Sequence, residues 1–201
     1  MNLNRVAAVI LASGFSQRFG SDDKLLSHLN GQPLAAHSAA LVSALPFHSA
    51  TAIVPANNTK LIQLYDDAGI EPVQNHNADL GQGASLALAI NHMKNTPVDA
   101  ALILLADMPF VTAAHIKKLA DRMDDRDAVA SRHGDVPQPP LLFARSTFEA
   151  LATLSGDKSG KAFLATLSNT AFVDMTAREA TDIDTPEALA LAVAQAQTSV
   201  D

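Results

Sequence analysis

The sequence of 201 residues contains no cysteine and no tryptophan, and aromatic residues make up only 4% of it. Without cysteine, a disulfide framework, a zinc–thiolate site and a thiol nucleophile are all excluded. With so few aromatic rings, alanine, leucine, isoleucine and valine must fill the interior. The chain also lacks an excess of basic residues. Its formal net charge is -7, which argues against non-specific nucleic-acid binding because that binding needs a basic surface. A nucleotide substrate is compatible with this charge, since only the local field at a pocket acts on it.

The first apolar run, residues 6–11, is too short to span a bilayer. No small-x-small cleavage site follows it, so we interpret it as a core strand rather than a signal peptide. The seven histidines are scattered and form no H-E-x-x-H motif, which argues against a histidine metal site. We therefore expect a cytoplasmic protein that forms one domain over residues 1–201, with no membrane and no nucleic acid as partner.

Apolar runs and helical patterns alternate along most of the chain. Strands are expected at residues 6–11, 50–54, 71–74, 99–106, 127–131, 141–143 and 171–174. Helices are expected at residues 33–45, 57–68, 84–93, 113–123, 145–154, 161–167 and from 186 to about 197. Asn30 and Gly31 predict a turn, and residues 133–140 are interpreted as a proline-rich break. This order predicts a three-layer α/β fold with a mostly parallel sheet, in which ligands bind beyond the carboxyl ends of the strands.

The loop after the first strand combines small residues with two positive charges, in the sequence LASGFSQRFGSDDK over residues 11–24. Gly14 and Gly20 allow tight turns and close approach to a ligand, while Arg18 and Lys24 favour an anion. The spacing fits neither the dinucleotide fingerprint G-x-G-x-x-G nor the Walker A loop G-x-x-x-x-G-K-[ST]. The loop therefore indicates phosphate binding of another kind. The alternative is an ordinary strand-to-helix loop with surface charges.

Two later segments carry candidate ligands. An expected helix begins near Gly81, Gly83 and Ser85, where N–H groups and a hydroxyl can contact a substrate. The alternative is that this polar loop only connects a strand to a helix. Asp107 directly follows the strand that is most apolar in sequence. A carboxylate at this position could bind a Mg²⁺ ion that also contacts substrate phosphates. The alternative for Asp107 is a capping or turn role. Thr112 is better placed to cap the following helix, so we favour the metal.

The segment before the last helix is acidic, with Asp182 and Asp184 followed by Thr185 and Pro186. Asp184 or Thr185 capping the helix, with Pro186 in its first turn, explains most of these residues. Asp182 is left without such an explanation.

Several of these motifs agree in order with one family. Residues 11–24 resemble the L-A-[AG]-G-x-S-x-R-x-G-x-x-K signature of the MobA-like nucleotidyltransferases, with one extra residue before Lys24. Residues 105–109 resemble the family's L-x-D-M-P segment, residues 81–86 its G-x-x-x-S-L loop, residues 156–161 its G-D-x-G-A-R turn, and residues 182–186 its D-I-D-T-P segment. Within the family the chain looks most like the molybdenum cofactor cytidylyltransferases, which join CTP to molybdopterin-bound molybdenum and release pyrophosphate. The resemblance implies a Rossmann-like, GT-A-like nucleotidyltransferase fold.

The resemblance also implies a site. Arg18 would clamp the β- and γ-phosphates and Lys24 would steady charge at the α-phosphate, as the two catalytic residues. Mg²⁺ would be bound by Asp107 with Asp184 or Asp182 as second ligand. Main-chain N–H groups of residues 12–16 would hold the triphosphate, and residues 81–85 the base and ribose. The nucleotide-binding residues it implies are Leu11, Ala12, Ser13, Gly14, Gly81, Gly83, Ser85 and Asp107.

Two departures from the family pattern leave specificity open. Ser13 stands where the family usually has Ala or Gly, near the base, so both CTP and GTP remain candidates. Gln138, Pro139 and Pro140 replace the start of the family's G-H-P-x-L-F segment, which leaves the acceptor open between the molybdopterin cofactor and another phosphorylated compound such as a sugar phosphate. A molybdoenzyme or its chaperone would be a partner. The non-enzymatic alternative is a module that binds nucleotide or cofactor and delivers it.

Overall fold

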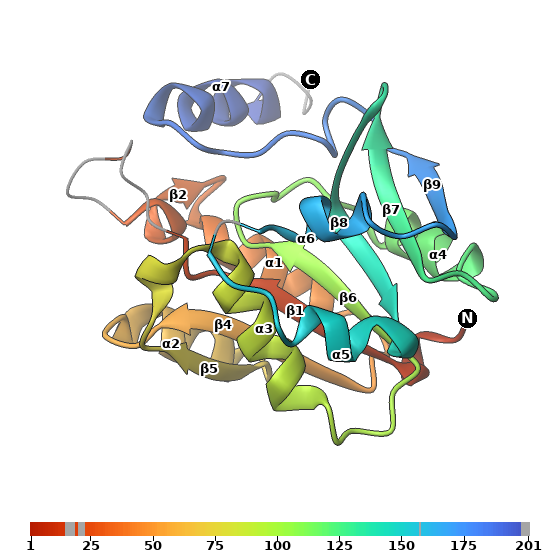
Figure 1. Cartoon of the computed structure of the whole chain (residues 1–201). Helices are drawn as coiled ribbons and strands as arrows, with labels where there is room; N and C mark the ends of the chain where they lie inside the picture. Colours follow the sequence, from red (N-terminus) through yellow and green to blue (C-terminus); the bar gives the residue numbers. More distant parts are fainter. Residues whose placement is uncertain (15–18, 20–22, 157, 198–201) are drawn as a thin grey trace.

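The computed structural model describes residues 1–14, 19, 23–156 and 158–197. Within them lies a seven-stranded sheet with the strand order β5-β4-β1-β6-β8-β7-β9 (Figure 1). Its strands are β1 (Val6–Leu11), β4 (Ser49–Pro55), β5 (Glu71–Asn75), β6 (Ala100–Leu105), β7 (Ala128–His133), β8 (Val136–Ala144) and β9 (Thr170–Asp174). Strands β4, β1 and β6 pair in parallel and β8 runs against its neighbours β6 and β7. The mostly parallel mixed sheet predicted from the sequence is confirmed.

The central strand β1 shows why helices cover both faces of the sheet. All six of its residues are buried. Val6, Ala8 and Ile10 belong to one apolar cluster, whereas Ala7, Val9 and Leu11 belong to the other. Because successive side chains of a strand point to opposite faces, a strand that is apolar throughout needs cover on each side.

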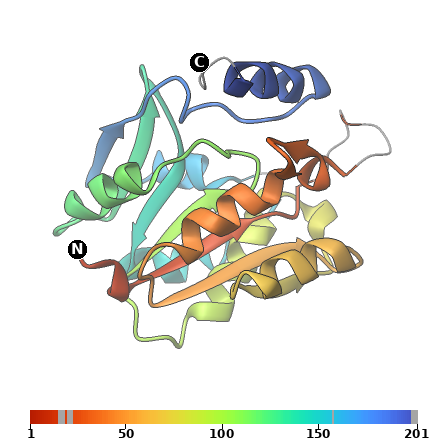
Figure 2. The same ribbon diagram turned by 180° about the vertical axis from the view of Figure 1, so that it is seen from behind.

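The helices supply that cover in two sets. Helices α1 (Leu34–Ser43), α2 (Thr59–Asp67) and α4 (Ala113–Asp121) contribute to the cluster on one face. Helices α3 (Gln82–Met93), α5 (Phe148–Leu151) and α6 (Gly160–Leu164) contribute to the cluster on the other, as the two opposite views show (Figures 1 and 2). The result is a three-layer α/β/α arrangement, as the sequence predicts. No helix in the described ranges has the length and apolar character needed to cross a membrane.

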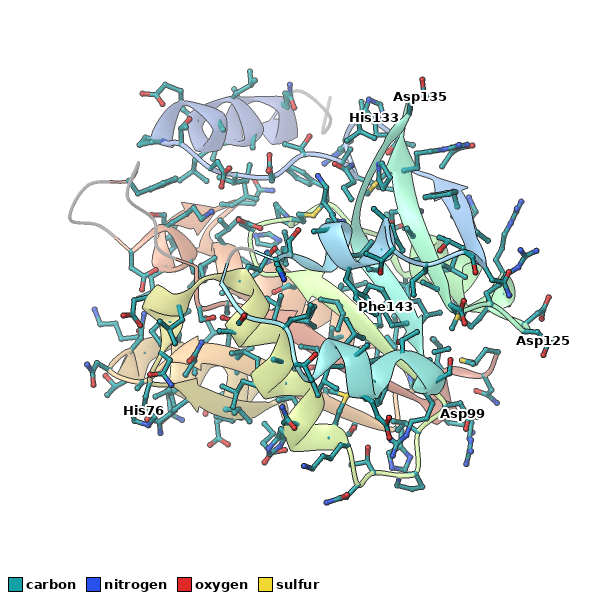
Figure 3. The ribbon with its side chains drawn as sticks, in the orientation of Figure 1. His76, Asp99, Asp125, His133, Asp135 and Phe143 are labelled. Carbon is teal, nitrogen blue, oxygen red and sulfur yellow. The ribbon has the colours of Figure 1, made fainter. Side chains whose placement is uncertain are left out.

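Buried and exposed positions can be followed at individual side chains. Figure 3 shows Phe143 inside the molecule, where it is fully buried, while Asp99, Asp125 and Asp135 lie at the periphery. The last helix, α7 (Pro186–Gln197), lies above the short hairpin of β2 (His28–Leu29) and β3 (Gln32–Pro33) (Figure 1). Its buried Ala192 joins the cluster that contains α1.

The turn predicted at Asn30 and Gly31 joins β2 to β3, and both residues have positive φ, 54° and 82°. This is the conformation that two-residue hairpin turns require and that Asn and Gly tolerate best. Short 3-10 turns complete the described elements: η1 (Leu3–Arg5), η3 (Lys24–Leu26), η4 (Ala78–Leu80) and η5 (Arg145–Thr147).

Two expectations about proline are wrong. Pro33 precedes α1 as its N-cap and lies in β3, so the helix begins at Leu34 instead of Pro33. The proline-rich break over residues 133–140 is largely a strand, because β8 begins at Val136. The register explains how prolines fit there: Ala130 pairs with Leu141 but Ser131 pairs with Gln138. The two intervening prolines of β8 therefore have no partner residue on β7, so the ladder loses nothing from their missing N–H groups.

Candidate active site

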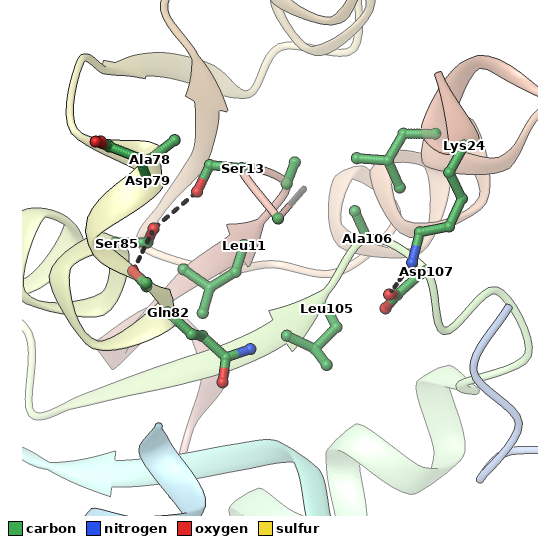
Figure 4. A pocket seen from close by; sticks show the side chains of 14 residues that line it. Leu11, Ser13, Lys24, Ala78, Asp79, Gln82, Ser85, Leu105, Ala106 and Asp107 are labelled. Atoms are coloured by element: carbon green, nitrogen blue, oxygen red, sulfur yellow. Dashed lines mark hydrogen bonds and ion pairs between the residues drawn. The ribbon is translucent and has the colours of Figure 1, made fainter. Parts of the chain in front are cut away.

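A cavity of about 320 Å³ opens where the carboxyl ends of β1 and β6 meet the start of α3 (Figure 4). This is the edge at which α/β sheets bind ligands. Leu11 at the end of β1 and Leu105 at the end of β6 line the cavity, together with the residues that follow them: Ala12, Ser13 and Gly14 after β1, and Ala106 and Asp107 after β6. The remaining walls come from Lys24, Leu25, Ala78, Asp79, Gly81, Gln82 and Ser85. Eight of the residues predicted from the sequence thus lie around one cavity: Leu11, Ala12, Ser13, Gly14, Lys24, Gly81, Ser85 and Asp107.

Three charged side chains meet at one end of this site. The ammonium nitrogen of Lys24 lies 2.7 Å from Oδ2 of Asp107 and 2.9 Å from Oδ1 of Asp184. Only 10% of the Lys24 side chain is exposed, against 19% for Asp107 and 36% for Asp184. The structure therefore brings together one predicted catalytic residue and two predicted metal ligands that are far apart in the sequence.

The surroundings of Lys24 keep its ammonium group charged. Burial by itself would lower the pKa of Lys24, because desolvation disfavours a charge. Attraction to Asp107 and hydrogen bonds to Asp107 and Asp184 outweigh that effect, so the pKa of Lys24 is raised above its ordinary value. A cation held in this way can act on phosphate oxygens at neutral pH.

The position of Asp184 follows from the residue before it. Ile183 is fully buried, and its N–H donates to the carbonyl oxygen of Asp107 at 2.9 Å. This bond fixes the segment before α7 against the end of β6. Thr185 then caps α7, since its Oγ1 accepts the N–H of Ala188 at 3.2 Å. The capping alternatives are thereby separated: Thr185 caps the helix, and the carboxylate of Asp184 contacts Lys24.

The carboxylate of Asp107 has a second oxygen with a different environment. Oδ1 of Asp107 is buried and has no hydrogen-bond partner among the described residues. Burying a carboxylate oxygen without a hydrogen-bond partner lowers the stability of the fold, unless a bound ligand supplies the missing partner. Asp182, the third predicted metal ligand, does not line the first cavity. Partial burial raises the pKa of its carboxyl group, and the charges of Asp184 and Asp107 raise it further.

The other end of the cavity holds a network of neutral polar groups. Oγ of Ser13 lies 2.8 Å from Oγ of Ser85, and Nδ2 of Asn75 donates to the same Ser85 oxygen at 3.0 Å. Oδ1 of Asn75 accepts the N–H of Asn77 at 2.9 Å. All three side chains of this network are buried. Asn75 is a residue that the sequence alone did not single out, because its role depends on contact with a helix ten residues later.

Two predicted backbone contacts take a different form in the structure. The N–H of Ala12 donates to the carbonyl oxygen of Ile53 at 2.9 Å, so the prediction that this N–H holds the triphosphate is wrong. The N–H of Gly83 donates to the carbonyl oxygen of Gly156 at 2.9 Å. A Cβ atom at Gly83 would lie 2.7 Å from the carbonyl oxygen of Lys158. The absence of a side chain at Gly83 therefore lets the backbone at Gly156 and Lys158 pack against α3. Nucleotide binding by Gly83 stays a prediction. Arg18 and Ser16 lie outside the described residues.

A second, smaller cavity of about 120 Å³ adjoins the first. Leu11, Gln82 and Leu105 line both of them, and Figure 4 shows the amide of Gln82 reaching toward the ends of β1 and β6. The polar side chains of the second cavity are those of Gln138, Lys161 and Asp182, apart from the shared Gln82. The sequence analysis missed Gln82 and Lys161, although both fall inside segments that resemble family motifs.

Comparison with known proteins finds similarity in sequence and in fold. A family model described as the MobA-like NTP transferase domain matches residues 8–171. The purine catabolism protein PucB of Bacillus subtilis is 26% identical over 189 residues, which cover 89% of this chain and 91% of the relative. A molybdenum cofactor guanylyltransferase of Shewanella putrefaciens is 26% identical over 143 residues, covering 70% of this chain and 69% of the relative. The solved structure of Rv0371C from Mycobacterium tuberculosis in complex with manganese superposes with a TM-score of 0.78 at 20% identity, over 94% of this chain and 98% of that one.

Proposed function

The chain belongs to the MobA-like NTP transferase family, and from this premise we propose that residues 1–201 act as one nucleotidyltransferase domain that moves a nucleoside monophosphate from an NTP onto a phosphorylated acceptor. The observation that carries the proposal is the ion-pair cluster of Lys24, Asp107 and Asp184 at the cavity. Such a transfer needs positioning and charge neutralisation more than covalent chemistry from the protein. The two ion pairs position the ammonium group of Lys24, and a divalent cation held by the carboxylates would complete the charge neutralisation.

The reaction consists of one displacement at phosphorus. A phosphate oxygen of the acceptor attacks the α-phosphorus and forms the new P–O bond. The bond between the α-phosphorus and its bridging oxygen breaks, and the electron pair leaves with pyrophosphate. The attacking oxygen is already an anion, so no serine or histidine base is required. Lys24 is the residue that would stabilise the charge developing at the α-phosphate, because its ammonium group is held charged at the cavity wall.

Asp107 and Asp184 are the residues that would hold a divalent cation, with Mg²⁺ as the proposed ion. The buried, unpartnered Oδ1 of Asp107 fits a ligand atom, and carboxylate oxygens are the donors that Mg²⁺ prefers. When bound, the ion would supply neutralisation of phosphate charge. No group of three or more His, Asp or Glu side chains in the described ranges could hold a metal. Two carboxylates together with substrate phosphates are sufficient, because Mg²⁺ sites commonly keep few protein ligands. The relative solved with manganese gives a reason to test both ions.

The second cavity is the proposed place for the acceptor. It shares a wall with the first cavity, so a phosphate there would lie beside the triphosphate. Lys161 provides a positive charge for that phosphate and Gln138 a hydrogen-bonding amide. Molybdenum-molybdopterin is the acceptor that we propose, on the basis of the sequence resemblance and of relatives named for the molybdenum cofactor. A molybdoenzyme or its chaperone would then receive the product.

The nucleotide has two candidates. The motif resemblance predicts CTP, whereas the relatives that are named guanylyltransferases favour GTP. We propose CTP as the substrate to test first and GTP as its competitor. The uncharged network of Ser13, Ser85 and Asn75 supports a subsite for base or ribose, because it offers hydrogen bonds without a formal charge.

One experiment separates these possibilities. The protein is incubated with Mg²⁺, each of the four NTPs labelled at the α-phosphate, and either molybdopterin cofactor or a sugar phosphate. Nucleotide binding, pyrophosphate release and product mass are measured. Label transfer from CTP with release of pyrophosphate is the expected result, and transfer from GTP would support the second candidate. Transfer only to a sugar phosphate would replace the acceptor. Tight nucleotide binding without any pyrophosphate release would contradict an enzyme and favour a delivery module.

A further inference from the structure

Lys24 projects from η3, a turn of only three residues, and this turn is anchored at two ends. At its C-terminal end, the carbonyl oxygen of Ser27 accepts the N–H of Leu34 at 2.9 Å, which joins the turn to α1. Leu25 is 5% exposed and packs in the apolar cluster. At the N-terminal end, the anchor is the side chain of Asp23. Within the turn, the N–H groups of Leu26 and Ser27 donate to the carbonyl oxygen of Asp23 at 3.0 and 3.1 Å, so the position of Asp23 influences where the lysine points.

The carboxylate of Asp23 uses its two oxygens for two different tasks. Oδ1 accepts the N–H of Leu25 at 3.0 Å and caps the turn. Oδ2 accepts a hydrogen bond from Nδ2 of Asn58. Asn58 in turn caps α2, since its Oδ1 accepts the N–H of Leu61 at 3.1 Å. The start of the turn that bears Lys24 is therefore fastened to the start of a nine-residue helix.

We infer that the hydrogen bond from Asn58 to Asp23 is a positioning link that holds the ammonium group of Lys24 between Asp107 and Asp184. Asn58 does not line either cavity and so would act through Asp23 and the turn. The alternative is that Asn58 only caps α2. The two roles use different atoms, because the cap needs Oδ1 and the link needs Nδ2.

That difference defines the variants. Asn58→Asp keeps an oxygen for the cap, since Asp and Asn are equally good N-caps, but it cannot donate to Asp23. The double variant Asp23→Asn with Asn58→Asp restores a donor and an acceptor in the reverse direction. Its net charge equals that of the wild type. Asn58→Ser, which also keeps a capping oxygen but adds no charge, serves as a second single variant if Asn58→Asp folds poorly.

The first measurement is the rate at which an amine-acylating reagent modifies Lys24 in the full chain, followed by peptide mass spectrometry. In the wild type, burial and the ion pairs protect the ammonium group of Lys24. In Asn58→Asp we expect this rate to rise roughly tenfold, the factor that loss of a hydrogen bond to a charged group commonly produces. The double variant should return toward the wild-type rate. The exposed Lys117 and Lys118 are internal standards that should not change.

The second measurement determines kcat and KM separately for nucleotidyl transfer. Its interpretation rests on the proposed function. A displaced lysine should lower kcat by roughly 10- to 100-fold and change the KM for NTP little, because it acts mainly in the transition state. The double variant should recover most of the loss. Thr112→Ala, which removes the cap of α4, is the matched control and should lower stability without exposing Lys24.

The outcomes distinguish the two ideas. Unchanged acylation of Lys24 in Asn58→Asp and Asn58→Ser would overturn the positioning link. Equal acylation in the single and double variants would also overturn it, since capping or charge would then explain the effect. If the wild type transfers no nucleotide but the acylation pattern appears as expected, the link stands and the proposed function fails.

Discussion

The two ends of the candidate active site differ in the kind of polar group that they bury. At one end, Lys24 forms ion pairs with Asp107 and Asp184. At the other, Ser13 and Ser85 share a hydrogen bond that involves no formal charge (Figure 4). Both ends draw on segments that are distant in the sequence. The structure has therefore collected two chemically distinct groups around one cavity.

The difference matches the two halves of a nucleotide. Charges in a partly buried site interact more strongly than charges in water, which suits a triphosphate and its cation. Hydroxyl and amide groups discriminate an uncharged partner by the geometry of its donors and acceptors. A chain with a net charge of -7 can thus still bind an anion, because a lysine and the cation that we propose for its two carboxylates would act at the site itself. We therefore expect substitutions at the charged end to slow nucleotidyl transfer, and substitutions at the neutral end to alter nucleotide binding and stability.

Removal of the lysine should have the largest effect. Lys24→Ala should lower kcat by roughly 10²- to 10³-fold, as observed when one preorganised group that stabilises developing charge is lost. The order of preference among the four NTPs should stay the same, because the neutral end is untouched. Steady-state kinetics with each NTP measures both quantities. Lys117→Ala, at an exposed position, is the matched control, and wild-type turnover in Lys24→Ala would remove this residue from the mechanism.

Neutralising the carboxylate at the end of β6 should have the next largest effect. Asp107→Asn should raise the Mg²⁺ concentration needed for half-maximal activity by at least about 10-fold, the scale seen when groups that merely support a metal ligand are lost. A Mg²⁺ titration, repeated with Mn²⁺, measures the change. The control is Asp99→Asn at the other end of the same strand, where Asp99 is ion-paired with Arg5. If both variants give the wild-type titration, Asp107 does not bind the metal.

The neutral end should respond mainly in stability. Ser85→Ala removes the middle of the network and leaves Nδ2 of Asn75 and the hydroxyl of Ser13 buried without this partner, which should cost about 1–3 kcal/mol. Ser13→Ala removes only one end, and its cost should be smaller. Urea denaturation gives the free energies of unfolding, and KM values for each NTP report on the subsite. A kcat loss as large as that of Lys24→Ala would break the distinction between the two ends.

The sequence predicted the parts of the fold that depend on local patterns. The strand at residues 6–11 has the predicted bounds, because six consecutive apolar residues after a short turn allow few other structures. Thr112 caps α4 as expected, since the capping preference depends on neighbouring residues only. Asp107 was found for a similar reason: a carboxylate directly after a buried strand is hard to explain by packing.

What the sequence could not show are contacts between distant segments. Pro139 and Pro140 of β8 look like a break until the register with β7 shows that these two residues have no partner on that strand. Gly83 looks like a phosphate-loop glycine until the carbonyl oxygens of Ser155, Gly156 and Lys158 are placed against it. Likewise, Asn58 is a residue type typical of an ordinary helix N-cap, and only its contact with Asp23 indicates a further role. These roles depend on the tertiary structure, which local propensity does not encode.

A second buried neutral network contains a titratable member and gives the smallest predicted effect. Nε2 of His115 lies 2.8 Å from Oγ of Ser131, which donates to the carbonyl oxygen of Pro140 at 2.7 Å beside the second cavity. Burial lowers the pKa of His115 below its ordinary value of 6.5; Lys118 lowers it further and Glu179 opposes the shift. The folded state thus binds this proton less readily than the unfolded state does. The stability that His115 contributes is complete above about pH 6.5 and is lost as the pH falls through its depressed pKa.

His115→Gln keeps a donor for Ser131, so urea denaturation between neutral and mildly acidic pH should show a shallower loss of stability in this variant than in the wild type. Parallel pH profiles would mean that His115 does not titrate in this window and that the network is as insensitive to pH as the one at Ser85.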